Sequence, residues 1–157
     1  MDIGSKKGYP AAAISNFAPY RFIFDGVECN SMEGLLQAFK FQNPEVQKEV
    51  CKLVGFKAKY RGKNKNWKRT RTLWWKGKPY NRFRDEYQGL LNRVYRALLT
   101  NKKFQKALLA TGNAVLTHKI GRRTEQETIL TRREFCGILT KLREELKDRK
   151  ISEFFRV

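Results

Sequence analysis

The sequence predicts a single α+β domain that is mainly α-helical, with a small strand component. Its 157 residues are the usual size of one domain and can bury a sizeable core. Apolar residues recur at helical spacing in several segments, and one short stretch has the pattern of a β-hairpin. Apolar residues make up 41% of the chain and aromatic residues 13%, which excludes a disordered basic tail. We divide the chain into a flexible, loosely held N-terminal arm (1–13), the domain itself (14–149) and an apolar C-terminal tail (150–157).

Local signals place a hairpin and a helix after the arm. Residues 20–29 alternate apolar and polar types on both sides of Asp25-Gly26, and Asp-Gly between such stretches is a strong hairpin signal. A helix is expected from Ser31, whose hydroxyl can cap it, through Phe41.

The rest of the chain carries further helix signals. A second helix opens at Asn43-Pro44, because proline suits the first turn of a helix, and it stops at Gly55. The best-signalled helix follows Thr131 and Glu134, which form a capping-box pattern ahead of regularly spaced apolar residues. The other expected elements are helices over 85–98 and 101–110 and a short strand over 114–117.

The composition excludes several classes of protein. No apolar run approaches the ~18–20 residues of a membrane helix, and residues 1–8 lack the apolar core of a secretory signal. The three cysteines are odd in number and widely spaced, which indicates buried, reduced thiols. With His118 as the single histidine, no zinc-ligand spacing can be written. We therefore expect a cytoplasmic protein without metal, cofactor or membrane partner.

The basic charge is concentrated in residues 50–84. The chain has 34 Lys and Arg against 15 Asp and Glu, a net charge of +19, and this segment holds 13 of the basic residues and none of the acidic ones. Seven aromatic residues are interleaved with them, and the glycines and proline favour loops and short elements. Cationic side chains neutralise phosphates and aromatic faces stack on bases, so the segment predicts nucleic-acid binding. A solvated loop with its tryptophans in the core is the alternative. The nucleic-acid-binding candidates are Lys57, Lys59, Arg61, Lys63, Lys65, Lys68, Arg69 and Arg71.

The helix over 31–41 carries three polar side chains on one face. Glu33, Gln37 and Lys40 lie at i, i+4 and i+7 of this helix. Nearly all the other residues around the helix are apolar, which is typical of a buried helix. One interpretation is a Glu33–Lys40 pair at the solvent edge. The other is a pocket wall in which Glu33 acts as acid, base or stabiliser of a developing cation. In such a pocket a desolvated, partly neutral Lys40 is a nucleophile toward a sugar carbon or its opened aldehyde.

The order of these motifs resembles the YbiA-like, or NADAR (NAD- and ADP-ribose-associated), family. The first block is specific, whereas the later matches near residues 58–62, 107–116 and 139–143 are weak alone, and the likeness covers about residues 14–146. The matching motifs are Ser15-Asn16-Phe17, Asp25-Gly26 and Ser31-x-Glu33-x-x-x-Gln37-Ala38-x-Lys40-Phe41.

The resemblance implies a compact, mainly helical domain with its pocket near the glutamate-containing helix, and N-glycosidic chemistry at a ribose C1. Family members hydrolyse N-ribosyl intermediates of riboflavin synthesis or remove ADP-ribose from guanine bases in nucleic acid, for which a lysine Schiff base has been proposed. By motif match the catalytic residues are Glu33 and Lys40, with Asn16 and Gln37 orienting the sugar or base. The full set of expected substrate contacts is Ser15, Asn16, Phe17, Gln37, Trp67, Trp75 and His118.

The chain departs from the family pattern at three places, and one of them is residues 50–84, which are longer and more basic than is usual in the family. Many members carry an Asp-x-x-Trp-Gly segment before the final helix, whereas residues 117–131 contain neither Asp nor Trp. Gly34 stands where a histidine is common. His118 is expected either to replace the missing Asp by holding a phosphate or the ribose, or to be an ordinary hydrogen-bonded histidine.

The residues after the last helix contain a second short motif. Ile151 to Phe155 reads I-x-x-F-F, the core of sliding-clamp-binding peptides, with Asp148 at the position of the usual glutamine. We expect this tail to pack back onto the domain, because apolar segments seldom stay exposed, with binding to a sliding clamp as the alternative.

Together these observations predict an N-glycoside hydrolase of phage-like character that removes ADP-ribose from modified nucleobases. Its expected substrate is ADP-ribosylated nucleic acid or an N-ribosyl nucleotide, and the +19 charge favours nucleic acid because a free metabolite needs only a local pocket. Two alternatives remain: a non-catalytic module that binds nucleic acid or ADP-ribose and NAD, and a hydrolase of riboflavin-pathway intermediates.

Overall fold

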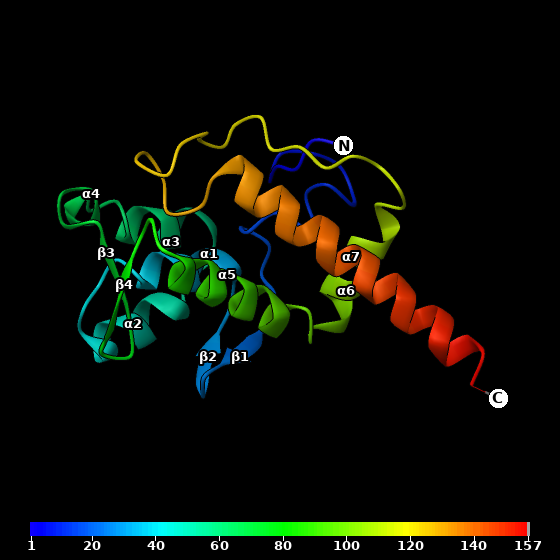
Figure 1. Ribbon diagram of the computed structural model, residues 1–157, viewed down its shortest axis with the longest axis horizontal. Coiled ribbons are helices and arrows are strands. Elements are labelled where there is room, and N and C mark those ends of the chain that lie inside the picture. Colours follow the sequence, from blue (N-terminus) through cyan, green and yellow to red (C-terminus); the bar gives the residue numbers. More distant parts are fainter. Residues whose placement is uncertain (157) are drawn as a thin grey trace.

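The computed structural model describes residues 1–156, with the elements arranged as Figure 1 shows. Two separate antiparallel hairpins accompany a larger set of helices, which confirms the mainly helical α+β fold. The strands are β1 (Phe22–Phe24), β2 (Val27–Cys29), β3 (Thr72–Trp75) and β4 (Lys78–Asn81). The helices are α1 (Met32–Ala38), α2 (Pro44–Cys51), α3 (Gly55–Arg61), α4 (Asn66–Thr70), α5 (Asp85–Leu98), α6 (Lys102–Ala110) and α7 (Arg132–Phe154).

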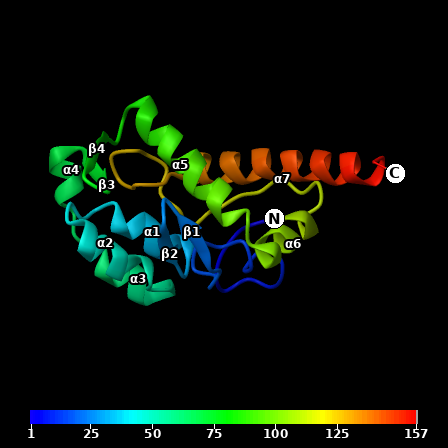
Figure 2. The same ribbon diagram turned by 90° about the horizontal axis from the view of Figure 1, so that it is seen from below.

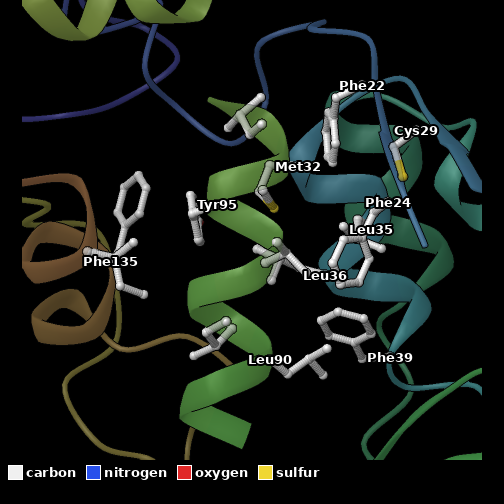
Figure 3. Packing of buried hydrophobic residues seen from close by; sticks show 14 of the residues in the cluster. Phe22, Phe24, Cys29, Met32, Leu35, Leu36, Phe39, Leu90, Tyr95 and Phe135 are labelled. Atoms are coloured by element: carbon white, nitrogen blue, oxygen red, sulfur yellow. The ribbon is translucent and has the colours of Figure 1, made fainter. Parts of the chain in front are cut away.

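The core is built around α1 and α5. Figure 3 shows Leu36 of α1 on the side of α5 and Leu35 beside Phe24, and both leucines and Leu90 of α5 are buried. On the other side of α5, Tyr95 packs against Phe135 of α7, with ring centroids 6.0 Å apart. Because α2 and α3 also pack on α1, this short helix is held from several directions. Its position is therefore fixed by apolar burial, which is the strongest term in folding.

Both hairpins are closed by two-residue turns with positive φ. Asp25 (φ 47°) and Gly26 (φ 79°) join β1 to β2, as the sequence predicts. Lys76 (φ 48°) and Gly77 (φ 85°) join β3 to β4 in the same way, inside the basic segment. The basic segment is thus two short helices and a hairpin, which agrees with the expectation of short elements.

The helix expected over 43–55 is in fact two helices. α2 ends at Cys51, and Gly55, with a φ of 60°, opens α3 instead of ending α2. The break brings the end of α2 against α1, because a Cβ added at Gly34 would meet the Leu53 carbonyl oxygen at 2.7 Å. Glycine at this position is therefore required by the packing of α1 on α2, and a histidine there would force the two helices apart.

The predicted helix starts are confirmed by the hydrogen bonds at their caps. The side chains of Ser31, Asn43, Asn101 and Thr131 each accept a backbone N–H from the first turn of the following helix. At α7 the Glu134 side chain also accepts the Thr131 N–H at 2.8 Å, which completes the capping box.

The segment 1–13 is packed onto the protein, so the expectation of a loosely held arm is wrong. Ile3 is fully buried, and its N–H donates to the Thr117 carbonyl at 2.8 Å. The strand expected over 114–117 reduces to one isolated parallel bridge between Asp2 and Thr117. Both errors have one cause: each segment is held by a partner that is remote in sequence.

The tail expected over 150–157 does not fold back onto the domain, and this prediction is also wrong. Through Phe154 it continues α7, which projects beyond the other helices in two perpendicular views (Figures 1 and 2). The side chains of Ile151, Phe154 and Phe155 are 57%, 75% and 78% exposed. Val157 lies outside the described residues.

A buried ion pair ties β4 to the start of α7. Arg82 is fully buried, and its guanidinium donates to both carboxylate oxygens of Glu134, at 3.1 and 2.7 Å. Its Nε also donates to the Thr128 carbonyl at 2.9 Å, and Gln88 donates to Glu134 at 2.6 Å. This network holds the loop before α7 against the body of the domain.

Replacing Arg82 by Met is expected to destabilise the protein by about 3–5 kcal/mol, because it leaves the Glu134 carboxylate buried without its cation. Chemical denaturation followed by circular dichroism measures the change. The double variant Arg82→Met/Glu134→Gln removes the unpaired charge, keeps a side chain that can serve the capping box, and should recover most of the loss. Equal losses in the single and double variants would contradict this interpretation.

Candidate active site

Helix α1 and the residue just after it carry the polar cluster predicted from the sequence. The Ser31 hydroxyl caps the helix by accepting the Gly34 N–H at 3.0 Å. The Glu33 N–H donates to the Asn16 carbonyl at 3.0 Å, which ties the first turn of α1 to the segment before β1. Lys40 follows the helix end, and its N–H still donates to the Gln37 carbonyl at 3.1 Å. The three polar side chains therefore remain on one side of a rigid element.

The Glu33 carboxyl lies in a largely dry environment. Gln37 donates its amide N–H to Glu33 Oε1 at 2.8 Å. Burial raises the pKa of the Glu33 carboxyl, while the Gln37 hydrogen bond and the charges of Lys40 and Lys59 oppose the shift. The side chain nonetheless keeps a partly exposed surface, so a ligand can reach it. A raised pKa favours the protonated carboxyl, which is the form that a general acid requires.

The pKa of Lys40 is shifted in the opposite direction to that of Glu33. Its ammonium donates to the Gly62 carbonyl at 2.6 Å. Burial lowers the pKa of Lys40 to about 8, the charge of Glu33 opposes that shift, and Lys68 adds to it. A neutral amine is therefore accessible near physiological pH, which is what a nucleophilic lysine needs. The structure thus favours a partly buried polar cluster over an exposed Glu33–Lys40 pair.

Gly62 packs directly against this cluster and contacts both Gln37 and Lys40. It is buried, and a Cβ added to it would lie 2.0 Å from Gln37 Oε1. Gln37 itself is only 8% exposed, and its Oε1 has no hydrogen-bond partner among the described residues. Position 62 therefore needs glycine for close approach rather than for backbone conformation, since its φ of −95° is open to other residues.

Replacing Gly62 by Ala is expected to displace Gln37 and to shift the carbonyl that holds Lys40. Overpacking of this kind costs about 1–3 kcal/mol of stability, and a reaction that depends on Gln37 and Lys40 should slow by more than about tenfold because the cluster loses its geometry. The matched control is Gly89→Ala on α5, where nothing lies within 4 Å of the added Cβ and stability should rise slightly. A Gly62→Ala variant with unchanged thermal melting and turnover would refute the role of this contact.

Residues 15–17, in the segment before β1, lie next to the first turn of α1. Asn16 Oδ1 accepts a hydrogen bond from the Tyr95 hydroxyl at 2.8 Å, so a buried tyrosine of α5 orients the amide. Ser15 Oγ accepts the Phe17 N–H at 3.2 Å, which is a local turn contact. The Phe17 ring packs edge-on against Phe56 of α3 at 5.1 Å. Tyr95 was missed because in the sequence it is one of several apolar residues at helical spacing.

The two tryptophans expected to contact substrate are core residues. Trp67 is 4% exposed and Trp75 is 3% exposed. Trp75 donates its indole N–H to Asp25 at 2.9 Å, and its ring packs against Phe24 and Phe39. No ring face of Trp75 is left for a ligand, so its assignment to the substrate site is wrong, and the burial of Trp67 argues against its assignment too.

Two other aromatic residues of the basic segment are exposed instead. Phe56 and Tyr60 lie one helical turn apart on α3 and are 63% and 70% exposed. α3 packs on α1, and the contact of Phe56 with Phe17 places this pair beside the Glu33 cluster. Lys63 lies over the Tyr60 ring at 4.3 Å. In the sequence nothing distinguishes these aromatics from the buried tryptophans, because each lies in an aperiodic run.

All eight basic residues expected to bind nucleic acid are exposed. They lie on α3, on α4 and on the segments that follow these helices. Arg61 lies over the Phe41 ring at 4.5 Å, and Lys59 and Lys68 are close enough to influence the pKa values of Glu33 and Lys40. The charged surface is therefore continuous with the candidate active site, and its binding to nucleic acid stays a prediction.

His118 belongs to a different neighbourhood. Its Nδ1 is hydrogen-bonded to the Ile3 carbonyl at 2.8 Å, and its ring packs edge-on against Phe135 at 5.2 Å. His118 does not lie beside Glu33 but is linked to it by a series of contacts. The His118 ring packs on Phe135, and Phe135 packs on Tyr95. The Tyr95 hydroxyl donates to the Asn16 side chain, and the Asn16 carbonyl accepts the Glu33 N–H. These contacts favour the ordinary structural interpretation of this histidine, and its role in substrate binding stays a prediction.

Within residues 1–156 no three His, Cys, Asp or Glu side chains gather as metal ligands do, and no helix is long and apolar enough to cross a bilayer. Cys29 and Cys51 are buried free thiols, and Cys136 is half-buried.

The fold is that of a YbiA-like domain. The NMR structure of the E. coli protein YbiA is similar, with a TM-score of 0.62 over 94% of this chain and 84% of that one. At 19% identity this is a likeness of fold, and it confirms the YbiA-like architecture that the motifs predict.

The chain belongs to the bacteriophage protein GP30.3 family, whose model matches residues 8–144. A 17.1 kDa protein from the Gp30-rIII intergenic region of Enterobacteria phage T4 is 36% identical over 149 residues, which span 93% of this chain and 98% of the relative. The phage-like character expected from the compact, basic sequence is thereby supported.

Proposed function

We propose that this protein hydrolyses the bond between a ribose C1 and a base nitrogen, removing ADP-ribose from modified bases in nucleic acid. The observation that carries the proposal is the partly buried cluster of Glu33, Gln37 and Lys40. In this cluster the pKa of the carboxyl is raised and that of the amine is lowered to about 8. Such opposed shifts mark sites of acid–base and nucleophilic chemistry.

The cluster fits the demands of C1–N cleavage. The bond breaks through an oxocarbenium-like state, by analogy with glycoside hydrolysis. Glu33 either protonates the departing nitrogen or, once ionised, stabilises the positive charge that develops at C1. Gln37 orients Glu33 through their hydrogen bond. Lys40, when neutral, can form a bond to C1 as the base nitrogen leaves with a proton from Glu33; water then adds to C1 and releases the lysine amine, which leaves free ADP-ribose and the unmodified base.

The surface beside the cluster favours a nucleic-acid substrate. Phe56 and Tyr60 expose their rings on α3, with basic side chains around them, and this combination suits unpaired bases and their phosphates. The net charge of +19 attracts a polyanion at long range. A small metabolite would need only a local binding site, so this charge favours nucleic acid. We expect single-stranded substrate, because aromatic faces stack only on bases that are free of a duplex.

The test compares kcat/KM on a single-stranded oligonucleotide that carries ADP-ribosylated guanine with kcat/KM on the free ADP-ribosylated nucleoside. Phe56→Ala/Tyr60→Ala should lower the value for the oligonucleotide by about tenfold or more, since stacking contributes ~1–3 kcal/mol per base, and should leave the nucleoside unaffected. Ile23→Ala, which removes a 64% exposed apolar side chain on β1, is the control. Equal losses on both substrates would contradict a stacking role.

The second candidate is a binding module without turnover. The absence of the Asp-x-x-Trp-Gly segment from residues 117–131 favours it. Such a module would bind the plain oligonucleotide with steep salt dependence and release no ADP-ribose. Hydrolysis of riboflavin-pathway intermediates without action on the oligonucleotide would identify the third alternative.

A further inference from the structure

The end of α7 presents an apolar surface that the domain does not cover. We call Ile151, Phe154 and Phe155 the apolar turn; their side chains are 57%, 75% and 78% exposed. The two phenyl rings pack edge-on at 5.3 Å. In both views the last part of α7 extends away from the other helices (Figures 1 and 2). Large apolar side chains gathered in this way mark an interaction site.

Helix geometry explains why the domain cannot bury this surface. The buried residues of α7 include Leu142 and Leu146, which face the core. Nine residues separate Leu142 from Ile151, and at about 100° per residue this places Ile151 on the opposite side of the helix. Phe154 and Phe155 follow at i+3 and i+4 and therefore share the side of Ile151. Ile151 and Phe155 therefore face away from the core and Phe154 lies on the flank of the helix. All three follow Leu146, the last buried residue of α7, so the apolar turn is available to another molecule.

A second copy of the chain is a poor occupant for this surface. Two buried aromatic side chains contribute only about 150–250 Å² each, whereas stable protein–protein interfaces bury about 1,200–2,000 Å² in total. Each copy also carries a net charge of +19, so two copies repel. Three apolar side chains on one helical turn instead fit the insertion of a short anchor into a pocket on a larger partner.

We propose that the apolar turn docks into an apolar pocket, rimmed by acidic side chains, on a sliding clamp. The spacing of Ile151, Phe154 and Phe155 is that of the I-x-x-F-F core by which peptides bind such clamps, and the structure presents it as one exposed helical turn. Arg149, Lys150 and Arg156 outnumber Asp148 and Glu153 in the same segment, so its net positive charge complements an acidic rim. This inference is independent of the proposed hydrolase activity.

The experiment uses the full chain and the purified sliding clamp of the same source genome, with affinity measured by calorimetry. Wild type should bind, and Phe154→Ala/Phe155→Ala should weaken binding by at least about tenfold, as expected for central aromatic anchors. Because these side chains are exposed, the variant should melt at the wild-type temperature. Ile120→Ala, which removes another side chain that is 77% exposed, is the matched control and should bind like wild type. Glu33→Gln should also bind like wild type, which separates this proposal from the hydrolase.

Three results would overturn the proposal. The first is no binding of wild type to the clamp, and the second is equal binding by wild type and Phe154→Ala/Phe155→Ala. The third is a dimer in light scattering that the same variant converts to a monomer, which would identify a second copy as the occupant.

Discussion

Glu33→Gln is expected to lower the release of ADP-ribose from modified nucleic acid by at least about 100-fold, the usual contribution of a positioned acid or base. The amide is nearly the same size as the carboxyl and can still hydrogen-bond Gln37, so the loss should appear in kcat rather than in substrate affinity. Release is measured by chromatography of the free ADP-ribose under saturating substrate.

The control for Glu33→Gln is thermal melting, which shows whether the variant is still folded. Because burial raises the pKa of Glu33, the folded protein gains nothing from the ionised carboxyl there, and Glu33→Gln should melt at or above the wild-type temperature. Full activity in a well-folded Glu33→Gln protein would remove Glu33 from the chemistry.

The Lys40 amine should set the pH dependence of the reaction. With the pKa of Lys40 lowered to about 8, kcat is expected to rise with pH below that value, as the fraction of neutral amine grows. Above it, a plateau identifies Glu33 as an ionised stabiliser of the positive charge, and a second decline identifies Glu33 as the general acid. Lys40→Ala should lose both this step and at least about 100-fold in kcat, because it lacks the nucleophile. The measurement is a pH–rate profile from pH 6 to about 9.5 for both proteins.

The control for the profile is His118→Gln. A histidine is the other side chain that commonly titrates near neutral pH, so it could imitate the step. His118 bonds to Ile3 and packs on Phe135, away from Glu33, so its replacement should leave the profile unchanged. A profile that persists in Lys40→Ala but changes in His118→Gln would assign the step to the histidine instead.

The lowered pKa of Lys40 also makes the stability of the folded protein depend on pH. A lysine whose pKa is lowered on folding binds its proton less well in the folded state than in the unfolded state, so the penalty is full below about pH 8. The contribution of Lys40 therefore becomes less unfavourable as the pH rises from about 8 toward its ordinary value.

Features with a local cause were predictable from the sequence. The Asp25-Gly26 turn and the caps at Ser31 and Thr131 depend on backbone geometry and hydrogen bonds within a few residues, and each is found where its signal lies. The polar face of Glu33 and Gln37 was predictable for the same reason, since a helix fixes their spacing.

Features set by distant partners were not predictable. Trp75 looks like Phe56 in the sequence, but β3 turns it into the core against Phe24, whereas α3 turns Phe56 outward. Ile3 is one apolar residue in a polar arm, and only its partner Thr117 shows that the arm is held. The role of Gly62 depends on its contact with Gln37, 25 positions earlier in the chain.

The most direct measurement of the central claim is the release of free ADP-ribose from a single-stranded oligonucleotide that carries ADP-ribosylated guanine. Wild type should release one ADP-ribose per modified base over many turnovers, while Glu33→Gln and Lys40→Ala remain near the background rate. Tight, salt-sensitive binding of wild type to the oligonucleotide without any release would contradict the account and leave a binding protein that keeps the YbiA-like fold.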